Sequence, residues 1–255
     1  MLKDNRMWQI YETVRKNTVL GVCDVGTDHA WLPIELVSSG AVPFAIATDI
    51  SRPSIEKGEN NISLCGLSGK IATYCANGTL GVPLDGIGDI VIAGMGGELI
   101  ASILAADERL RNPALHFVLQ PMTKQIELRE FLYSNGFCIN SESCVRDGDR
   151  IYFIMSVSYA YYKNALDTRA LLLGFGTKDD RNLFDYAKKL ASLLRVRLEG
   201  LRAAENSAPF ADEMRTLTER LTFLDAYVKQ NEPRFSPILP SSQSIPYNFF
   251  KKPRS

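Results

Sequence analysis

The chain has 255 residues, of which 45% are hydrophobic and 23% charged, so it can bury one full core with sequence left over for a smaller appendage. Its net charge is zero, but residues 1–160 sum to −5 and residues 161–255 to +5, which hints at a polyanionic partner for the second part. The five cysteines form no Cys-x-x-Cys pair and no long apolar segment follows a basic start, so we expect a cytoplasmic protein with no disulfide, bound metal or membrane span.

The first elements of the chain predict a ligand site. Residues 1–16 have apolar side chains at helical spacing, which predicts a helix with its basic residues, Arg6 among them, exposed. A short apolar run then ends at Asp24, followed by the turn residue Gly26 and by a second apolar run from Trp31. This pattern indicates a strand, a tight loop and a helix. In an open parallel sheet such a junction lies where ligands bind, so we expect the floor of a nucleoside-cofactor site here.

The next apolar run, residues 44–50, also ends in an acid, as a buried parallel strand beside a ligand does. Asp49 follows Gly26 by 23 residues, and its type and spacing match the acid that accepts hydrogen bonds from ribose hydroxyls in nucleotide-binding α/β domains. Alternatively, Asp49 caps the helix that starts near Ser51. The loop and the acid occur in the expected order, which favours ribose binding.

Two later loops extend this pattern. The third strand, residues 70–75, is followed by Asn77 and Gly78, and the Asn77 carbonyl oxygen could accept a hydrogen bond from the exocyclic amine of an adenine. A plain Asn-Gly turn explains the same residues equally well. The fourth strand, residues 89–93, runs into three glycines within residues 94–97, where a bare backbone lets a flat ring approach closely.

The remaining strands decide the fold class. A fifth strand over residues 115–120 ends at Gln120, and strands over residues 137–145 and 151–159 flank a strong hairpin turn. A terminal antiparallel pair separates methyltransferase sheets from dehydrogenase sheets, so we expect an α/β Rossmann-like methyltransferase domain with a seven-stranded sheet over residues 1–160. Helices are expected between the strands over residues 30–38, 52–65, 98–105 and 124–134.

The chain changes character after the sheet domain. Within residues 161–230, apolar residues step by three or four in two segments, which predicts a C-terminal α-helical coiled-coil hairpin. Its first helix carries basic residues at intervals of seven, along one side: Arg181, Lys188, Arg195 and Arg202. This basic stripe suits phosphate contacts, although a solvated helix face explains it equally well. Residues 231–255 are rich in Pro and Ser, and we expect little regular structure there.

Four motifs together carry a family resemblance. The first loop reads D-V-G-T-D-H-A-W-L-P over residues 24–33, and the fourth strand runs into A-G-M-G-G over residues 93–97. With A-T-D-I at residues 47–50 and L-Q-P at residues 119–121, the series resembles the bacterial TrmK family of tRNA (adenine-22-N1)-methyltransferases. The similarity covers about residues 17–158, and the hairpin resembles the family's helical extension.

The resemblance implies S-adenosylmethionine as the cofactor, tRNA as the partner with no obligate protein partner, and methylation of N1 of adenine 22 as the reaction. It implies cofactor contacts from the ends of the first four strands: Asp24, Gly26, Thr27, Asp28, Asp49, Ile50, Asn77, Gly78, Ala93, Gly94 and Met95. Substrate contacts are expected from Gly96, Gly97 and the basic stripe.

The implied chemistry singles out three side chains. Neutral adenine N1 has a lone pair, so no strong base is needed, but the product is cationic and a nearby carboxylate would stabilise the developing charge. Asp28 is the candidate for this role, His29 could hold the cofactor or the nucleotide, and Gln120 could receive the ring. Asp28 could instead cap the next helix, and His29 could be a packed ring.

Alternatives from other classes stay open. The chain could methylate another RNA base, or bind S-adenosylmethionine and RNA without turnover. A dehydrogenase is disfavoured because Asp28 and Trp31 stand where the G-x-G-x-x-G turn needs glycines. Because N1 lies on the pairing edge of adenine, the target base must be unpaired or extruded.

Overall fold

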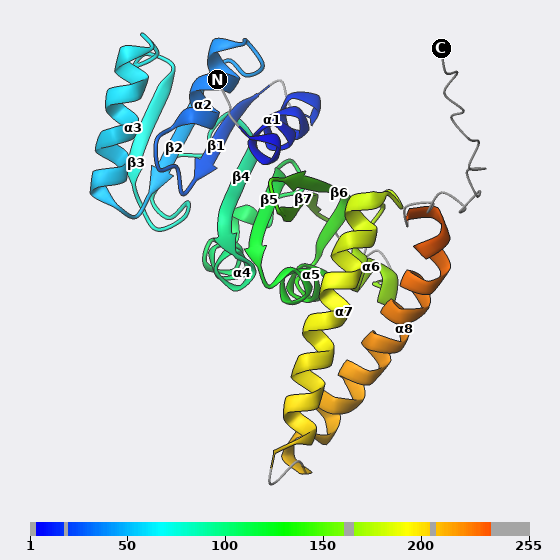
Figure 1. Cartoon of the computed structure of the whole chain (residues 1–255). Helices are drawn as coiled ribbons and strands as arrows, with labels where there is room; N and C mark the ends of the chain where they lie inside the picture. Colours follow the sequence, from blue (N-terminus) through cyan, green and yellow to red (C-terminus); the bar gives the residue numbers. More distant parts are fainter. Residues whose placement is uncertain (1–3, 18–19, 161–165, 205–207, 236–255) are drawn as a thin grey trace, which may run out of the picture.

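The structure is a computed structural model that describes residues 4–17, 20–160, 166–204 and 208–235. Within these ranges, seven strands form one sheet: β1 (Gly21–Val25), β2 (Ala45–Asp49), β3 (Ile71–Cys75), β4 (Ile87–Gly96), β5 (His116–Thr123), β6 (Phe137–Asp147) and β7 (Arg150–Tyr159). Their order is β3-β2-β1-β4-β5-β7-β6, and β7 is antiparallel to both neighbours (Figure 1). The expected Rossmann-like sheet with a terminal antiparallel hairpin is therefore confirmed.

Helices cover both faces of the sheet: α1 (Asn5–Asn17), α2 (Trp31–Ser38) and α3 (Arg52–Leu64) on one, α4 (Gly97–Ala106) and α5 (Gln125–Ser134) on the other. Neighbouring residues of each central strand belong to opposite layers. Val22 and Val118 pack towards α1 and α2, whereas Cys23 and Phe117 pack towards α4 and α5. This alternation follows from the two-residue repeat of a strand, and it explains why the strands read as continuous apolar runs.

Strands β4 and β5 are longer than the sequence predicts. β4 continues through the glycine segment to Gly96, and β5 continues through Pro121 to Thr123, with the register shifting around Met95. Gly94 has a φ of +79°, which allows the irregular step after which pairing resumes. The glycine segment is therefore held in the sheet, instead of forming the free loop that its composition suggests.

The helical hairpin is confirmed as α7 (Arg181–Arg202) and α8 (Ala211–Phe235), preceded by a short helix α6 (Thr168–Leu173) that the sequence did not predict. The pair projects from one end of the sheet domain (Figure 1). One buried apolar cluster runs from the sheet through Leu172 to Leu183 and Leu224. The base of the hairpin is thus packed into the same core as the sheet.

A buried ion pair lies at this junction. Arg129 of α5 and Glu142 of β6 are both fully buried, with Nη2 and Oε2 2.7 Å apart. The Arg129 guanidinium also donates to the Leu171 carbonyl oxygen (3.0 Å), and Glu142 accepts from the Phe175 amide (2.9 Å). Because the pair binds backbone on both sides of the end of α6, it fixes the connection to the hairpin.

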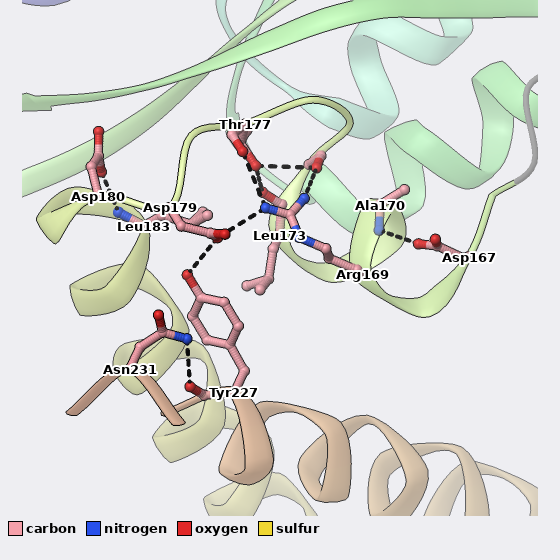
Figure 2. A network of polar contacts seen from close by, with 11 residues as sticks. Asp167, Arg169, Ala170, Leu173, Thr177, Asp179, Asp180, Leu183, Tyr227 and Asn231 are labelled. Atoms are coloured by element: carbon pink, nitrogen blue, oxygen red, sulfur yellow. Dashed lines mark hydrogen bonds and ion pairs between the residues drawn. The ribbon is translucent and has the colours of Figure 1, made fainter. Parts of the chain in front are cut away.

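Polar contacts between α6, α7 and α8 continue this junction (Figure 2). Asp179 accepts hydrogen bonds from Arg169 (3.0 Å) and from the Tyr227 hydroxyl of α8 (3.1 Å). Asp167 and Asp180 cap the first turns of α6 and α7. The hairpin therefore leaves the sheet domain in a defined direction.

The expectation of little regular structure from residue 231 is wrong for residues 231–235, which complete α8. Asn231 donates to the Tyr227 carbonyl oxygen (3.0 Å), and the Phe235 ring packs on Phe184 of α7 with centroids 5.4 Å apart. The local bond and the tertiary ring contact together outweigh the effect of Pro233 in the last turn. Residues 236–255 lie outside the described ranges.

The described residues also answer three questions, about disulfides, metal ligands and membrane spans. All five cysteines are free thiols. No group of three or more His, Cys, Asp or Glu in these ranges is placed to hold a metal ion. Every helix in the same ranges is too short or too polar to cross a lipid bilayer.

Candidate functional site

A cavity of about 650 Å³ opens at the carboxyl ends of β1 and β4. Its walls come from Asp24 and residues 26–32 of the first loop, from Ala93 and Gly94 at the end of β4, and from α1. Two of the four loops that the sequence singles out therefore meet in one hollow, beneath a helix that the sequence did not connect with it. This is the position in an open α/β sheet where ligands bind.

Gly26 makes the first loop possible. Its φ of +81° lies in the left-handed region, and a Cβ added there would stand 2.1 Å from Cε of Met95. The amides of Gly26 and Thr27 donate to the Thr48 carbonyl oxygen at the end of β2, at 2.7 and 2.9 Å. The loop is thus pinned to β2 on one side and contacts the glycine segment of β4 on the other.

Two carboxylates lie at the carboxyl ends of the first two strands: Asp49 is the last residue of β2, and Asp24 is the last but one of β1. Asp24 is buried on the cavity floor, and burial raises its pKa to about 6, with the nearby Asp49 charge adding to the shift and the Thr27 hydroxyl opposing it. Asp49 is half-buried, and its Oδ1 accepts from the Ser51 amide (2.7 Å). Ser51 itself caps α3, so the alternative that Asp49 is that cap is wrong.

Asp28 and His29 form a pair on the rim of the cavity. Oδ2 of Asp28 lies 3.1 Å from Nε2 of His29, and the two side chains are 63% and 44% exposed. Lys57 lies 3.8 Å from the same carboxylate. The residue that caps α2 is Ala30, without a side-chain hydrogen bond, so the alternative of a capping Asp28 is wrong. The His29 ring is partly buried, and its role stays a prediction.

Gln120 lies behind the cavity wall and is fully buried. Its Oε1 accepts from the Gly94 amide (3.1 Å) and from the Arg6 guanidinium (2.8 Å), and its Nε2 donates to the Pro121 carbonyl oxygen (2.9 Å). Both ends of the amide are therefore used within the protein. This arrangement suits a residue that holds Gly94 in place better than one that receives the substrate ring.

The other expected cofactor residues lie outside the cavity lining. Ile50 and Asn77 are exposed beyond the ends of β2 and β3. Gly78 is buried, and its carbonyl oxygen accepts from the Thr48 hydroxyl (3.0 Å), so this loop is tied to the strand that holds Gly26. Met95 contacts the first loop, as described above. These residues lie along the carboxyl edge of the sheet, next to the cavity. Their contacts with the cofactor stay predictions.

Of the two glycines expected at the substrate, Gly97 has a packing reason of its own. A Cβ at Gly97 would stand 2.3 Å from the Lys124 carbonyl oxygen, so the close approach of α4 to the start of α5 requires glycine. Gly96 is the residue that caps α4, and a Cβ there would meet Thr123 Oγ1 at 3.4 Å. Contact with a base is still a prediction for both.

All four residues of the basic stripe are exposed on α7, but two of the charges are compensated. Arg195 pairs with Asp225 of α8 at 2.8 Å. Arg181 pairs with Asp185 at 3.0 Å and donates to the Phe235 carbonyl oxygen. Lys188 lies over the Phe184 ring, 5.5 Å from its centroid. The stripe is therefore partly used to hold the hairpin together.

Sequence reasoning missed the contribution of α1. Asp4, Arg6 and Met7 line the cavity, and Arg6, which was expected to be exposed, is half-buried against Gln120 and the Tyr152 ring. The amphipathic pattern showed which face of the helix is buried. It held no signal for which strands that face covers, because that depends on contacts more than 100 residues away in the chain.

The cavity fits a nucleoside cofactor that carries positive charge. The left-handed Gly26 leaves space that any side chain would fill, the buried Asp24 supplies a carboxylate on the floor, and Asp49 ends the neighbouring strand. A carboxylate kept in a poorly solvated site gains from a positive neighbour. These features suit the cofactor half of a methyltransferase site.

The family described as Methyltransferase domain matches residues 3–155, more than half of the chain, and the chain belongs to this family. Its resemblance to TrmK proteins is confirmed by the relatives that match it. The curated tRNA (adenine(22)-N(1))-methyltransferase of Bacillus subtilis is 27% identical over 150 residues, which cover 59% of this chain and 62% of that relative.

Two solved structures match almost to their full length. The crystal structure of the B. subtilis m1A22 tRNA methyltransferase TrmK shares the fold with a TM-score of 0.78 at 20% identity, over 89% of this chain and 99% of that one. A Streptococcus pneumoniae structure in complex with S-adenosyl-L-methionine is 27% identical, with a TM-score of 0.69 over 89% of this chain and 100% of that one. The helical hairpin belongs to the shared architecture, because both matches reach beyond the sheet domain.

Proposed function

We propose that this chain transfers a methyl group from S-adenosylmethionine to N1 of adenine 22 in tRNA. The observation that carries the proposal is the juxtaposition, on one cavity, of a buried acid at the end of β1 with an exposed Asp28–His29 pair on the rim. The first suits a positively charged cofactor, and the second suits a base on which positive charge develops. The similarity to the B. subtilis enzyme supports the choice of adenine N1.

The cofactor half is assigned to the ends of β1, β2 and β4. Asp24 and Gly26 would hold the cofactor from the cavity floor, and Asp49 would accept hydrogen bonds from its ribose. When bound, S-adenosylmethionine supplies an electrophilic methyl group on a sulfonium. The backbone around Gly94, fixed by Gln120 and Arg6, forms the facing wall of the cavity.

The substrate half needs positioning and charge stabilisation rather than a base. N1 of neutral adenine attacks with its own lone pair, so no side chain has to remove a proton first. The positive charge that the ring gains is stabilised by the Asp28 carboxylate at the rim. His29 fixes that carboxylate through its 3.1 Å contact, and Lys57 at 3.8 Å limits its negative charge.

We assign the body of the tRNA to the helical hairpin. Replacing all four residues of the basic stripe with Gln should weaken tRNA binding and leave S-adenosylmethionine binding intact. Arg181 and Arg195 already form ion pairs within the protein, so they should contribute less to tRNA binding than Lys188 and Arg202. Lys188→Gln with Arg202→Gln should lower the slope of log K against log salt by about 2, roughly 1 per phosphate contact. Arg181→Gln with Arg195→Gln, the matched control, should change the slope less, and an unchanged tRNA affinity in all variants would remove the assignment.

The direct test is incubation of the protein with methyl-labelled S-adenosylmethionine and unmodified tRNA, followed by mapping of the labelled nucleoside. We expect label in 1-methyladenosine at position 22, and none in a transcript with guanosine there. Label at another base would identify a different RNA methyltransferase. Cofactor and tRNA binding without label would identify a binding protein without turnover.

A further inference from the structure

The geometry points to Trp31 as the platform on which the target adenine stacks. This inference rests on the proposed function and deepens it, because it names the side chain that receives the base. The chain contains two tryptophans, Trp8 and Trp31, and both are largely exposed, at 53% and 47%. The two rings differ in their aromatic contacts and in their position relative to the cavity.

Trp8 has an intramolecular partner and lies off the site. Its ring stacks on Tyr11 within α1, with centroids 5.2 Å apart and planes 23° apart. Trp31 lines the cavity and, within the described residues, makes no ring–ring contact. A large aromatic side chain that is left half-open inside a cavity supplies a flat apolar surface for a ligand.

The backbone holds Trp31 in this position. Ala30 has a φ of +57° and a ψ of 24°, one of two non-glycine residues with positive φ in the described chain. Such a conformation persists only where the surroundings impose it. Here Asn61 donates to the His29 carbonyl oxygen (3.0 Å), Ala30 is fully buried, and Leu32 is buried one residue later. Trp31 is thus an outward-facing residue between two anchored ones.

The chemistry of the neighbours fits an adenine base. Asp28 and His29 line the same cavity and come three and two residues before Trp31, so a base stacked on Trp31 would have a carboxylate and an imidazole near it. An extruded base gains from stacking on an aromatic face, and tryptophan gives the strongest attraction for a cation. Because methylation makes the adenine cationic, the indole would favour the transition state and not only the bound ground state.

The test uses the two tryptophans as matched reporters. The Trp8→Phe protein keeps Trp31 as its single indole, and the Trp31→Phe protein keeps Trp8. With S-adenosylhomocysteine present, unmodified tRNA should quench the fluorescence of the first protein and leave that of the second nearly unchanged. A tRNA with an abasic position 22 should not quench Trp31. Equal quenching by the abasic tRNA, or quenching by the cofactor product alone, would overturn the inference.

Kinetics provide the second measurement. Trp31→Leu should raise KM for tRNA about tenfold and also lower kcat, since stacking is worth about 1–3 kcal/mol per base by truncation. Trp31→Phe should bring KM most of the way back to its original value, because a phenyl ring still stacks on the base. It should restore kcat less completely, because a phenyl ring attracts a cation more weakly than an indole. Cofactor affinity should stay within twofold in both. If the Trp8→Phe protein is active and the Trp31→Leu protein has the same KM for tRNA and the same kcat, Trp31 does not stack on the base. If neither Trp8→Phe nor the unaltered protein methylates A22, the proposed function fails instead.

Discussion

The chain has two histidines, and each pairs with an aspartate at one end of the sheet. At the carboxyl ends of the strands, His29 meets Asp28 at 3.1 Å on the open rim of the cavity. At the amino ends, Nδ1 of His116 lies 2.5 Å from Oδ1 of Asp89, and its Nε2 lies 2.8 Å from the Ser156 hydroxyl.

The buried set has the order of groups that activates a serine nucleophile, but its surroundings are those of a structural contact. The Asp89 and His116 side chains are 1% and 17% exposed, and Ser156 is buried. The three residues come from β4, β5 and β7, so the histidine ties three strands together. The two pairs therefore share their residue types and differ in access to solvent, which only a group that meets a ligand requires.

The largest effect should come from breaking the buried pair. Asp89→Ala removes the acceptor of His116 and leaves its largely buried ring without that partner, which should lower the free energy of unfolding by about 3 kcal/mol. Asp28→Ala, the matched change at the exposed pair, should cost less than about 0.5 kcal/mol. Denaturant unfolding of both variants measures the difference. Equal losses would show that burial does not separate the two pairs.

For catalytic activity, the exposed pair should matter more than the buried set. Asp28→Ala should lower kcat for tRNA methylation about 10²-fold, as expected for a lost electrostatic contact to a developing charge, with cofactor affinity little changed. Ser156→Ala should leave kcat within about twofold, because its hydroxyl lies away from the cavity. Steady-state assays with saturating cofactor and tRNA measure both. A comparable loss in a folded Ser156→Ala protein would move the chemistry to the other end of the sheet.

The smallest effect should be the pH dependence of cofactor binding. The Asp24 pKa is raised to about 6, so its carboxyl is mostly protonated at pH 5 and mostly ionised at pH 7. A positively charged cofactor favours the ionised form, so the Kd for S-adenosylmethionine should fall about tenfold between these pH values and level off above them. Calorimetry across this range is the measurement, and Asp24→Asn should flatten the profile. If the Kd of that variant changed with pH as in the unaltered protein, another group would be responsible for the pH dependence.

Local patterns were sufficient for most of the fold. The strands and helices of the sheet domain, the terminal hairpin and the two long helices all follow from apolar periodicity and turn residues such as Gly26 and Gly148. The errors fall where tertiary contacts override local preference. Pairing with β5 draws the glycines of β4 into the sheet, and packing on Phe184 extends α8 past Pro233.

The candidate site was predicted only in part. Asp24, Gly26, Asp28 and His29 were found because they follow one another in a single loop, where sequence order is spatial order. The wall that α1 provides was missed, and Gln120 was expected at the substrate although it binds Arg6 and Gly94. Such contacts join residues more than 100 positions apart and leave no periodic trace in the sequence.

The sequence by itself determined the succession of strands and helices along the chain and the chemical character of the first loop, because these depend on neighbours along the chain. Only the tertiary structure decided which charged groups are open to a ligand. It buried Asp89, compensated Arg181 and Arg195, and left Asp28 at the cavity. The physical reason is that desolvation and ion pairing depend on everything packed around a group, whereas the sequence specifies only the group itself.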